Sequence, residues 1–329
     1  MSLLPLTLGC WNYDRTSALL DGRVRIEGVD LRAIPLRIEE LFYRVFHNHE
    51  FDITEMSLSA YMMAVENEPW EYVAIPVFLS RIFRHSAIYV RADAGIRTPA
   101  DLRGKRVGVP EYTQTAGITA RGILEDEYGV KPSELRWFNG GLEELGRKEK
   151  FPLNLADGVV VAAANEKSLS QMLLDGELDA LISASAPSCY SPDGPVVRLF
   201  PDFRERERAY YVKTGIFPIM HTVGIRRRLV EEHPWLPVSV AKAFLHAKNL
   251  CLDDIDGTAG ANKATVPWLF ADVEEAKTLM GRDWWPYGID ANRRSLEAAA
   301  TWSHRQGLTG RRMRPEELFA PSTHGEFKI

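Results

Sequence analysis

The chain has few cysteines, and the three that it has, Cys10, Cys189 and Cys251, lie far apart. An odd number at such spacing fits neither a disulfide framework nor a metal knuckle. No apolar run reaches membrane length. The glycine pair at 140–141 lacks the rest of a dinucleotide fingerprint, and the sequence contains neither a P-loop nor a nucleophile elbow. These absences argue against the commonest cysteine-, nucleotide- and serine-based sites.

A strong excess of one charge is also lacking. Forty basic and 45 acidic residues give a net charge of −5, which offers no reason to expect nucleic acid or an anionic membrane as a partner. Hydrophobic residues make up 45% and charged residues 26% of the chain, as in ordinary globular proteins. With 329 residues the chain is long enough for two lobes of ordinary size.

The amino terminus lacks the pattern of an export signal. Such a signal has a basic region, an apolar region and a small-residue cleavage site. Residues 3–10 are a short apolar run with no lysine or arginine before it, and they lead directly into residues 11–14. We interpret this segment as a first strand and its loop, and we therefore expect a cytoplasmic protein.

Strand-like and helix-like segments alternate through the first half, which favours a mostly parallel α/β sheet. We expect strands near residues 6–10, 28–35, 51–56, 72–79, 86–91, 106–109, 135–138, 158–161, 180–183 and 196–200. Helices are expected near 16–20, 38–48, 57–66, 116–128 and 166–174. A further strand is expected over 211–225, and the rest of the chain is predicted to be helical.

Residues 101–116 are the most informative stretch. A basic turn leads into a short strand, a hydroxyl-rich corner and then a helix, so Thr113 and Thr115 lie at the unpaired N–H groups of a helix N-terminus. Such a corner accepts an anion. The stretch resembles the start of the second lobe in type II periplasmic-binding-protein folds, where this corner faces a ligand cleft between two α/β lobes.

This resemblance implies a two-lobed fold with a helical C-terminal tail. We expect residues 1–91 to form the first part of lobe 1, residues 92–203 to form lobe 2, and residues 204–329 to complete lobe 1 and its helical extension.

The densest cluster of polar residues follows a predicted strand and contains Ser80, Arg81, Arg84 and His85. Ligands bind at strand carboxyl ends in open α/β sheets. Two guanidinium groups suit a dianion, because each grips a carboxylate through two parallel hydrogen bonds. The alternative is that both arginines are surface residues that pair with nearby acids.

Other candidates lie in three further segments. His221, near Phe217 in an apolar strand, is either a core histidine or a proton carrier in the cleft. Glu55 and Ser57 end another strand, although Ser57 is equally suited to be a plain helix N-cap. Glu111 and Tyr112 precede the anion corner. The aromatic block at 283–288 either walls an aromatic ligand or packs the tail, and the histidines at 47 and 49 have the wrong spacing for a metal site.

Taken together, residues 9–14, 51–61, 76–85, 101–116, 215–223 and 283–293 resemble the 4,5-dihydroxyphthalate decarboxylase family. The resemblance implies conversion of 4,5-dihydroxyphthalate to protocatechuate and CO₂ in aromatic catabolism. It implies a proton donor (His221 or His85), a partner for the phenol (Glu55 or Glu111) and a carboxylate clamp (Arg81 and Arg84). Further substrate contacts are expected from Trp11, Ser57, Ser80, Tyr112, Thr113, Thr115 and Phe217.

No organic cofactor is expected, because the substrate is its own electron sink; a divalent metal on the catechol oxygens is left open. The expected partner is a small aromatic dicarboxylate, and a homo-oligomer is left open. One alternative is a non-catalytic solute-binding protein for an aromatic acid. Another is a different enzyme of this fold, with menaquinone-type or pyrimidine-precursor chemistry.

Overall fold

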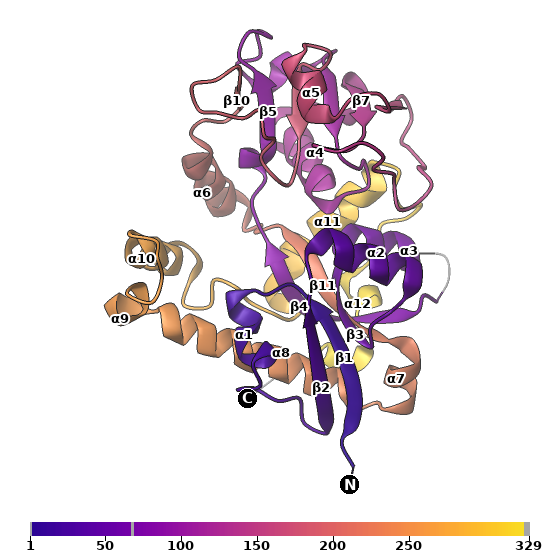
Figure 1. Cartoon of the computed structure of the whole chain (residues 1–329), viewed down its shortest axis with the longest axis vertical. Helices are drawn as coiled ribbons and strands as arrows, with labels where there is room; N and C mark the ends of the chain where they lie inside the picture. Colours follow the sequence, from indigo (N-terminus) through magenta and orange to yellow (C-terminus); the bar gives the residue numbers. More distant parts are fainter. Residues whose placement is uncertain (1, 67–68, 326–329) are drawn as a thin grey trace.

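Two β-sheets, one above the other in Figure 1, organise the chain in a computed structural model that describes residues 2–66 and 69–325. The first sheet has five strands in the order β2-β1-β3-β11-β4 and the second has six in the order β10-β5-β9-β6-β7-β8. Each sheet packs against its own group of buried apolar side chains.

The first sheet brings strand ends together at one edge. Strands β1, β2 and β3 run parallel, whereas β11 is antiparallel to both β3 and β4. The carboxyl ends of β1, β3 and β4 therefore lie at the same edge as the amino end of β11. The strands are β1 (Leu4–Cys10), β2 (Val29–Pro35), β3 (Ile53–Ser57), β4 (Tyr72–Arg81) and β11 (Ile219–Arg226).

Helices cover both faces of this sheet. In α2 (Ile38–Asn48) the buried Leu41, Phe42 and Val45 share one face, as the helical spacing in the sequence predicts. The helix ends at His49, whose φ of 48° is left-handed. The other helices at this end are α1 (Ser17–Leu20), α3 (Leu58–Val65), α7 (Arg227–Glu232), α8 (Leu236–Ile255) and α12 (Pro315–Leu318), with the 3₁₀ turns Asp14–Thr16 and Pro321–Thr323.

The second sheet contains β5 (Ile88–Arg91), β6 (Arg106–Val109), β7 (Arg136–Asn139), β8 (Val161–Ala163), β9 (Ala180–Ile182) and β10 (Val196–Arg198). Its helices are α4 (Thr115–Tyr128) and α5 (Leu169–Leu174), with 3₁₀ turns at Pro99–Leu102 and Pro132–Glu134. Helix α4 follows β6 directly, so its N-terminus points toward the first sheet's edge, and the helix is buried over most of its length.

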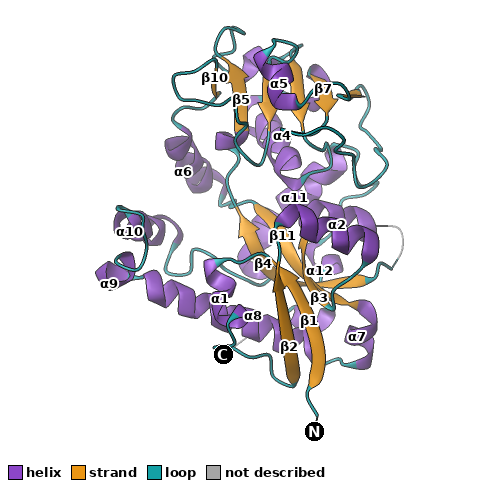
Figure 2. Ribbon diagram, in the orientation of Figure 1, coloured by secondary structure: helices purple, strands orange, loops and turns teal. Residues whose placement is uncertain are grey.

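The chain crosses between the sheets at the 3₁₀ turn His85–Ala87, after β4, and again through α6 (Phe203–Thr214), after β10. The tail then forms α9 (Gly257–Ala261) and α10 (Leu269–Met280), which project to one side in Figure 2, a 3₁₀ turn (Asp290–Asn292) and α11 (Arg293–Arg305). From α11, Trp302 enters the core of the second sheet, so the tail joins both halves.

The strand predicted over 211–225 is wrong in its first part. Helix α6 extends through Thr214, and β11 begins only at Ile219. The β-prone Tyr211 and Val212 are helical because they continue a charged segment that begins with the Asp202–Arg206 ion pair at i,i+4. Gly215, with φ of 67°, then ends the helix in a left-handed conformation.

The expected lobe boundaries at 91/92 and 203/204 stay a prediction. Strand β5, which ends at residue 91, pairs with β9 and β10 in the second sheet.

None of the described helices is long and apolar enough to cross a membrane.

Candidate functional site

A cavity of about 1050 Å³ lies between the two sheets, where the strand ends of the first sheet face the N-terminus of α4. Its volume is slightly above the usual range for small-ligand sites. Most of the residues that the sequence predicts for the site line it: Trp11, Ser57, Ser80, Arg81, Arg84, Glu111, Thr113, Thr115 and His221. The others, Glu55, His85, Tyr112 and Phe217, do not.

His221 is held at the cavity by a buried carboxylate. The register of β11 places it beside Ser57 on β3 and Ser80 on β4. Its Nδ1 lies 2.6 Å from Oε1 of Glu55, whose side chain is fully buried. With Glu55 ionised, Nδ1–H donates to it, and Nε2 is left without a hydrogen-bond partner among the described residues. This is the arrangement of a histidine oriented for proton transfer.

Tyr13 completes this group, and the sequence analysis missed it. Its hydroxyl donates to Oε1 of Glu55 at 2.6 Å, and the backbone N–H of Trp11 donates to Oε2 at 3.0 Å. Burial, followed by the negative charge of Glu55, raises the pKa of Tyr13, so the phenol stays protonated. Its place in the loop after the first strand, two residues from Trp11, was the available signal.

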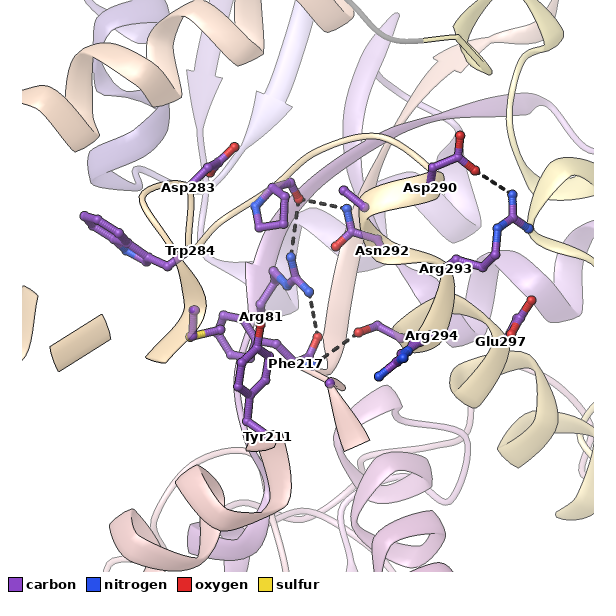
Figure 3. A pocket seen from close by; sticks show the side chains of 15 residues that line it. Arg81, Tyr211, Phe217, Asp283, Trp284, Asp290, Asn292, Arg293, Arg294 and Glu297 are labelled. Carbon is purple, nitrogen blue, oxygen red and sulfur yellow. Dashed lines mark hydrogen bonds and ion pairs between the residues drawn. The ribbon is translucent and has the colours of Figure 1, made fainter. Parts of the chain in front are cut away.

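Arg81 is buried without a carboxylate partner among the described residues. Its guanidinium donates to the backbone oxygens of Phe217 at 2.8 Å and Pro286 at 3.3 Å, as Figure 3 shows. Burial lowers the pKa of Arg81 to about 10, so it is still a cation at neutral pH. Arg81 also lines a second cavity of about 670 Å³, which is the one drawn in Figure 3, and it therefore separates the two spaces.

Arg84 has the same character. Its side chain is buried, its Nε donates to the sulfur of Met220 at 3.3 Å, and Nη1 reaches only the carbonyl of Ala184 at 3.5 Å. Burial lowers the pKa of Arg84 to about 10. A buried cation without a counter-ion is costly, so the two arginines give the cavity a strong preference for an anion.

Comparisons with known proteins agree with this geometry. Residues 20–197 match the family model described as "ABC transporter, phosphonate, periplasmic substrate-binding protein". The chain is 44% identical to 4,5-dihydroxyphthalate decarboxylase of Comamonas testosteroni over 331 aligned residues, which cover 100% of both chains. It belongs to the 4,5-dihydroxyphthalate decarboxylase family. The enzyme of the same name from Pseudomonas putida is 46% identical over 198 residues, or 60% of this chain and 77% of that protein.

Solved structures show the same fold at low identity. The putative sulfonate ABC transporter periplasmic sulfonate-binding protein of Methylobacillus flagellatus has a TM-score of 0.56 at 13% identity, covering 98% of this chain and 93% of that one. The periplasmic aliphatic sulphonate binding protein of Escherichia coli has a TM-score of 0.54 at 12% identity, covering 98% and 99%. The type II periplasmic-binding-protein-like fold and the family resemblance predicted from the sequence are both confirmed.

In this member of the decarboxylase family, the two threonine hydroxyls of the anion corner already have partners within the chain. Thr115 accepts from Ser59 N at 3.2 Å and bonds the hydroxyls of Ser57 at 3.0 Å and Ser59 at 2.8 Å, which ties α4 to α3 across the cleft. Thr113 donates from its hydroxyl to Glu149 at 2.7 Å. Ser57 also caps α3 and lines the cavity, and its contact with a substrate stays a prediction.

Glu111 lines the cavity, but it is not a free carboxylate. Arg147 donates to its Oε1 at 2.7 Å, and Lys150 contacts Oε2. The phenol-partner role considered for Glu111 therefore competes with two cations. Glu55 does not line the cavity, and it contacts it through His221, Tyr13 and Trp11, which do.

Three predicted residues have other surroundings. His85 is buried among Tyr128, Phe200 and Tyr210, and burial lowers its pKa to about 4. The structure does not bring it to the cavity, because the 3₁₀ turn that follows Arg84 directs neighbouring side chains differently. His85 is therefore a neutral core residue in this geometry and not a proton carrier for a ligand.

Tyr112 is fully buried, with the guanidinium carbon of Arg121 lying 3.7 Å from its ring centroid. Only its backbone N–H takes part in the anion corner, where it donates to Glu149. Phe217 lines the second cavity of Figure 3 and stacks beneath Arg81 at 4.7 Å. It contacts the site through that arginine. Within the described residues, no group of three His, Cys, Asp or Glu side chains is placed to hold a metal ion.

Proposed function

We propose that this chain is a carboxy-lyase that converts 4,5-dihydroxyphthalate to protocatechuate and CO₂. The observation that carries the proposal is the relationship with the Comamonas testosteroni enzyme, which extends over the whole of both chains. The cavity supports the proposal, because this reaction needs a proton donor and cations that bind carboxylates. His221 and the two buried arginines that line the cavity are such groups.

The reaction begins when the hydroxyl para to the departing carboxylate loses its proton to solvent. Its electron pair then pushes into the ring, toward the carbon that bears that carboxylate. His221 donates the proton on Nε2 to this carbon, which becomes tetrahedral. The bond to the carboxylate breaks, CO₂ leaves, and the bonding electrons restore the ring and the phenolate. Solvent then protonates the phenolate and His221.

Glu55 supports this step from behind. A carboxylate on Nδ1 fixes the orientation of the ring and stabilises the charged imidazolium before transfer. Tyr13 and the N–H of Trp11 hold both carboxylate oxygens, so Glu55 cannot rotate away from His221. We assign Glu55 and Tyr13 as positioning residues and His221 as the proton donor.

Arg81 and Arg84 hold the carboxylates of the substrate. An ortho-dicarboxylate supplies the direct ion-pair partner that neither guanidinium has among the described residues. Trp11 and Phe42 bring aromatic surface to the same cavity, which suits a flat ring. We assign the catechol oxygens to Ser80 and Ser57, which flank His221 in the sheet.

The direct test is to incubate the purified protein with 4,5-dihydroxyphthalate and to measure CO₂ and protocatechuate, with and without a chelator. We expect both products in equal amounts, with activity that survives chelation. Loss of activity with the chelator and its return with a divalent ion would show that a metal grips the catechol oxygens. Binding of the substrate without product would favour the solute-binding alternative, and neither binding nor turnover would favour another reaction of this fold.

The absence of an organic cofactor, the cytoplasmic location and the oligomeric state stay predictions. Turnover by protein refolded without added cofactor, fractionation of the native host and light scattering would test them in turn.

A further inference from the structure

One segment of the cavity wall belongs to neither sheet. Residues 146–150 lie between β7 and β8 and reach the cavity with three cations and one carboxylate. Arg147 and Lys150 both contact Glu111. Lys148 is exposed and makes no ion pair or hydrogen bond with any described residue.

Glu149 occupies the part of the anion corner that lies in the loop before α4. Its carboxylate accepts from the backbone N–H of Tyr112, from the N–H of Thr113 at 3.2 Å, from the Thr113 hydroxyl at 2.7 Å and from Nδ2 of Asn139 at 3.1 Å. A helix N-terminus adds its dipole to these bonds. The backbone N–H groups of the loop before α4 are thus already in use.

The two anion-binding parts of the cavity therefore differ. The arginines of the strand edge form no ion pair among the described residues, whereas the loop before α4 already binds a carboxylate of the chain itself. A substrate carboxylate gains more from a buried, uncompensated cation than from displacing a carboxylate that already has four donors.

We propose that Glu149 is a positioning residue that fastens segment 146–150 over the cavity, and that Lys148 is the specificity-determining cation that the segment presents to a dianionic ligand. The choice of a dicarboxylate rests on the proposed function; the fastening does not. The loop before α4 then serves as an anchor for the cavity wall.

Trypsin tests the fastening without any turnover, because Arg147, Lys148 and Lys150 are its cleavage sites. Cleavage at 147–150, followed by mass spectrometry, reports how often the segment opens. Removing charge-assisted hydrogen bonds in Glu149→Ala should speed this cleavage roughly 10- to 150-fold. The matched control is Glu144→Ala, an exposed glutamate close by whose side chain forms no hydrogen bond or ion pair with a described residue; it should cleave like the wild type.

Added acetate should slow cleavage of Glu149→Ala, because it refills the vacated corner, and it should leave Glu144→Ala unchanged. A general loss of folding would not respond in this way. The proposal is overturned if Glu149→Ala and Glu144→Ala cleave alike. It is also overturned if phthalate speeds cleavage of the wild type, since the ligand would then be displacing Glu149 from the corner.

Binding of phthalate and benzoate tests Lys148. We expect Lys148→Ala to weaken phthalate binding about two- to fivefold, as loss of an exposed ion pair would. Binding of the monoanion benzoate should weaken less. Lys242→Ala, an exposed lysine on α8, is the control. Equal losses of affinity for phthalate and benzoate would show that Lys148 does not select between a dianion and a monoanion. Neither measurement depends on CO₂ release, so failure here is distinguishable from failure of the proposed reaction.

Discussion

Glu55→Gln isolates the role of the carboxylate behind His221, since it preserves shape and removes charge. In the native site Glu55 is fully buried and accepts from His221 Nδ1 at 2.6 Å, Tyr13 at 2.6 Å and Trp11 N at 3.0 Å. Glutamine offers one oxygen in place of two and no negative charge for the imidazolium. Hydrogen bonds to charged groups contribute about 1.5–3 kcal/mol each. Losing the one to His221 should therefore lower kcat roughly 10- to 150-fold.

The assay pairs turnover with affinity. Initial rates of CO₂ release give kcat, and calorimetric titration with phthalate gives binding, because phthalate lacks the hydroxyls that drive the reaction. Affinity for phthalate should change less than kcat, since Glu55 does not line the cavity. Asp52→Asn is a control, because this partly buried carboxylate bonds Thr7 away from the cavity. Wild-type kcat in Glu55→Gln would refute the positioning argument.

Four further predictions follow from the same structure. Arg81→Ala and Arg84→Ala should each weaken phthalate binding roughly 30- to 4,000-fold, since losing one partner of a buried charge pair costs about 2–5 kcal/mol; titration showing unchanged affinity in both would remove the clamp. His221→Asn should slow turnover about 10²- to 10⁴-fold, with smaller changes in phthalate affinity; wild-type rates would show that another group donates the proton. The pKa of His85 is lowered to about 4, so the folded state resists a proton that the unfolded chain binds below about 6.5. The unfolding free energy should fall by up to about 3 kcal/mol as pH drops from 6.5 to 4. In urea titrations the unfolding free energy of His85→Gln should fall less over this pH range, with near-native turnover at pH 7. An equal fall in the variant and the wild type would contradict the neutral burial of His85. Gly122→Ala would place a methyl group 2.4 Å from the Trp302 ring, so its unfolding free energy should fall by about 1–3 kcal/mol; unchanged denaturation would mean that α11 shifts freely on α4.

The sequence was sufficient for the architecture because its signals there are local. The apolar spacing in α2 and the strand–corner–helix order at 106–128 each specify an element without help from the rest of the chain. The error at 211–214 arose where Tyr211 and Val212 favour a strand, although the charged turns before them had already started a helix. The strand propensity of these residues was outweighed there by the continuation of helix α6.

The site was only partly predictable, since a cavity depends on side-chain direction and on distant segments. Arg84 and His85 are neighbours in sequence, yet one lines the cavity and the other is packed among aromatic rings. Glu149, from a segment without any recognisable motif, fills a corner formed by Thr113 and its neighbours. Tyr13 acquires its role only when β1 and β3 pair, which brings Glu55 within reach.

The measurement closest to the central claim compares CO₂ release from 4,5-dihydroxyphthalate by the wild type and by His221→Asn at equal, saturating occupancy, with occupancy set by prior titration. The account predicts stoichiometric CO₂ and protocatechuate from the wild type, and a rate at least about 100-fold lower from the variant. Equal rates from both proteins, or saturating binding by the wild type without CO₂, would contradict it.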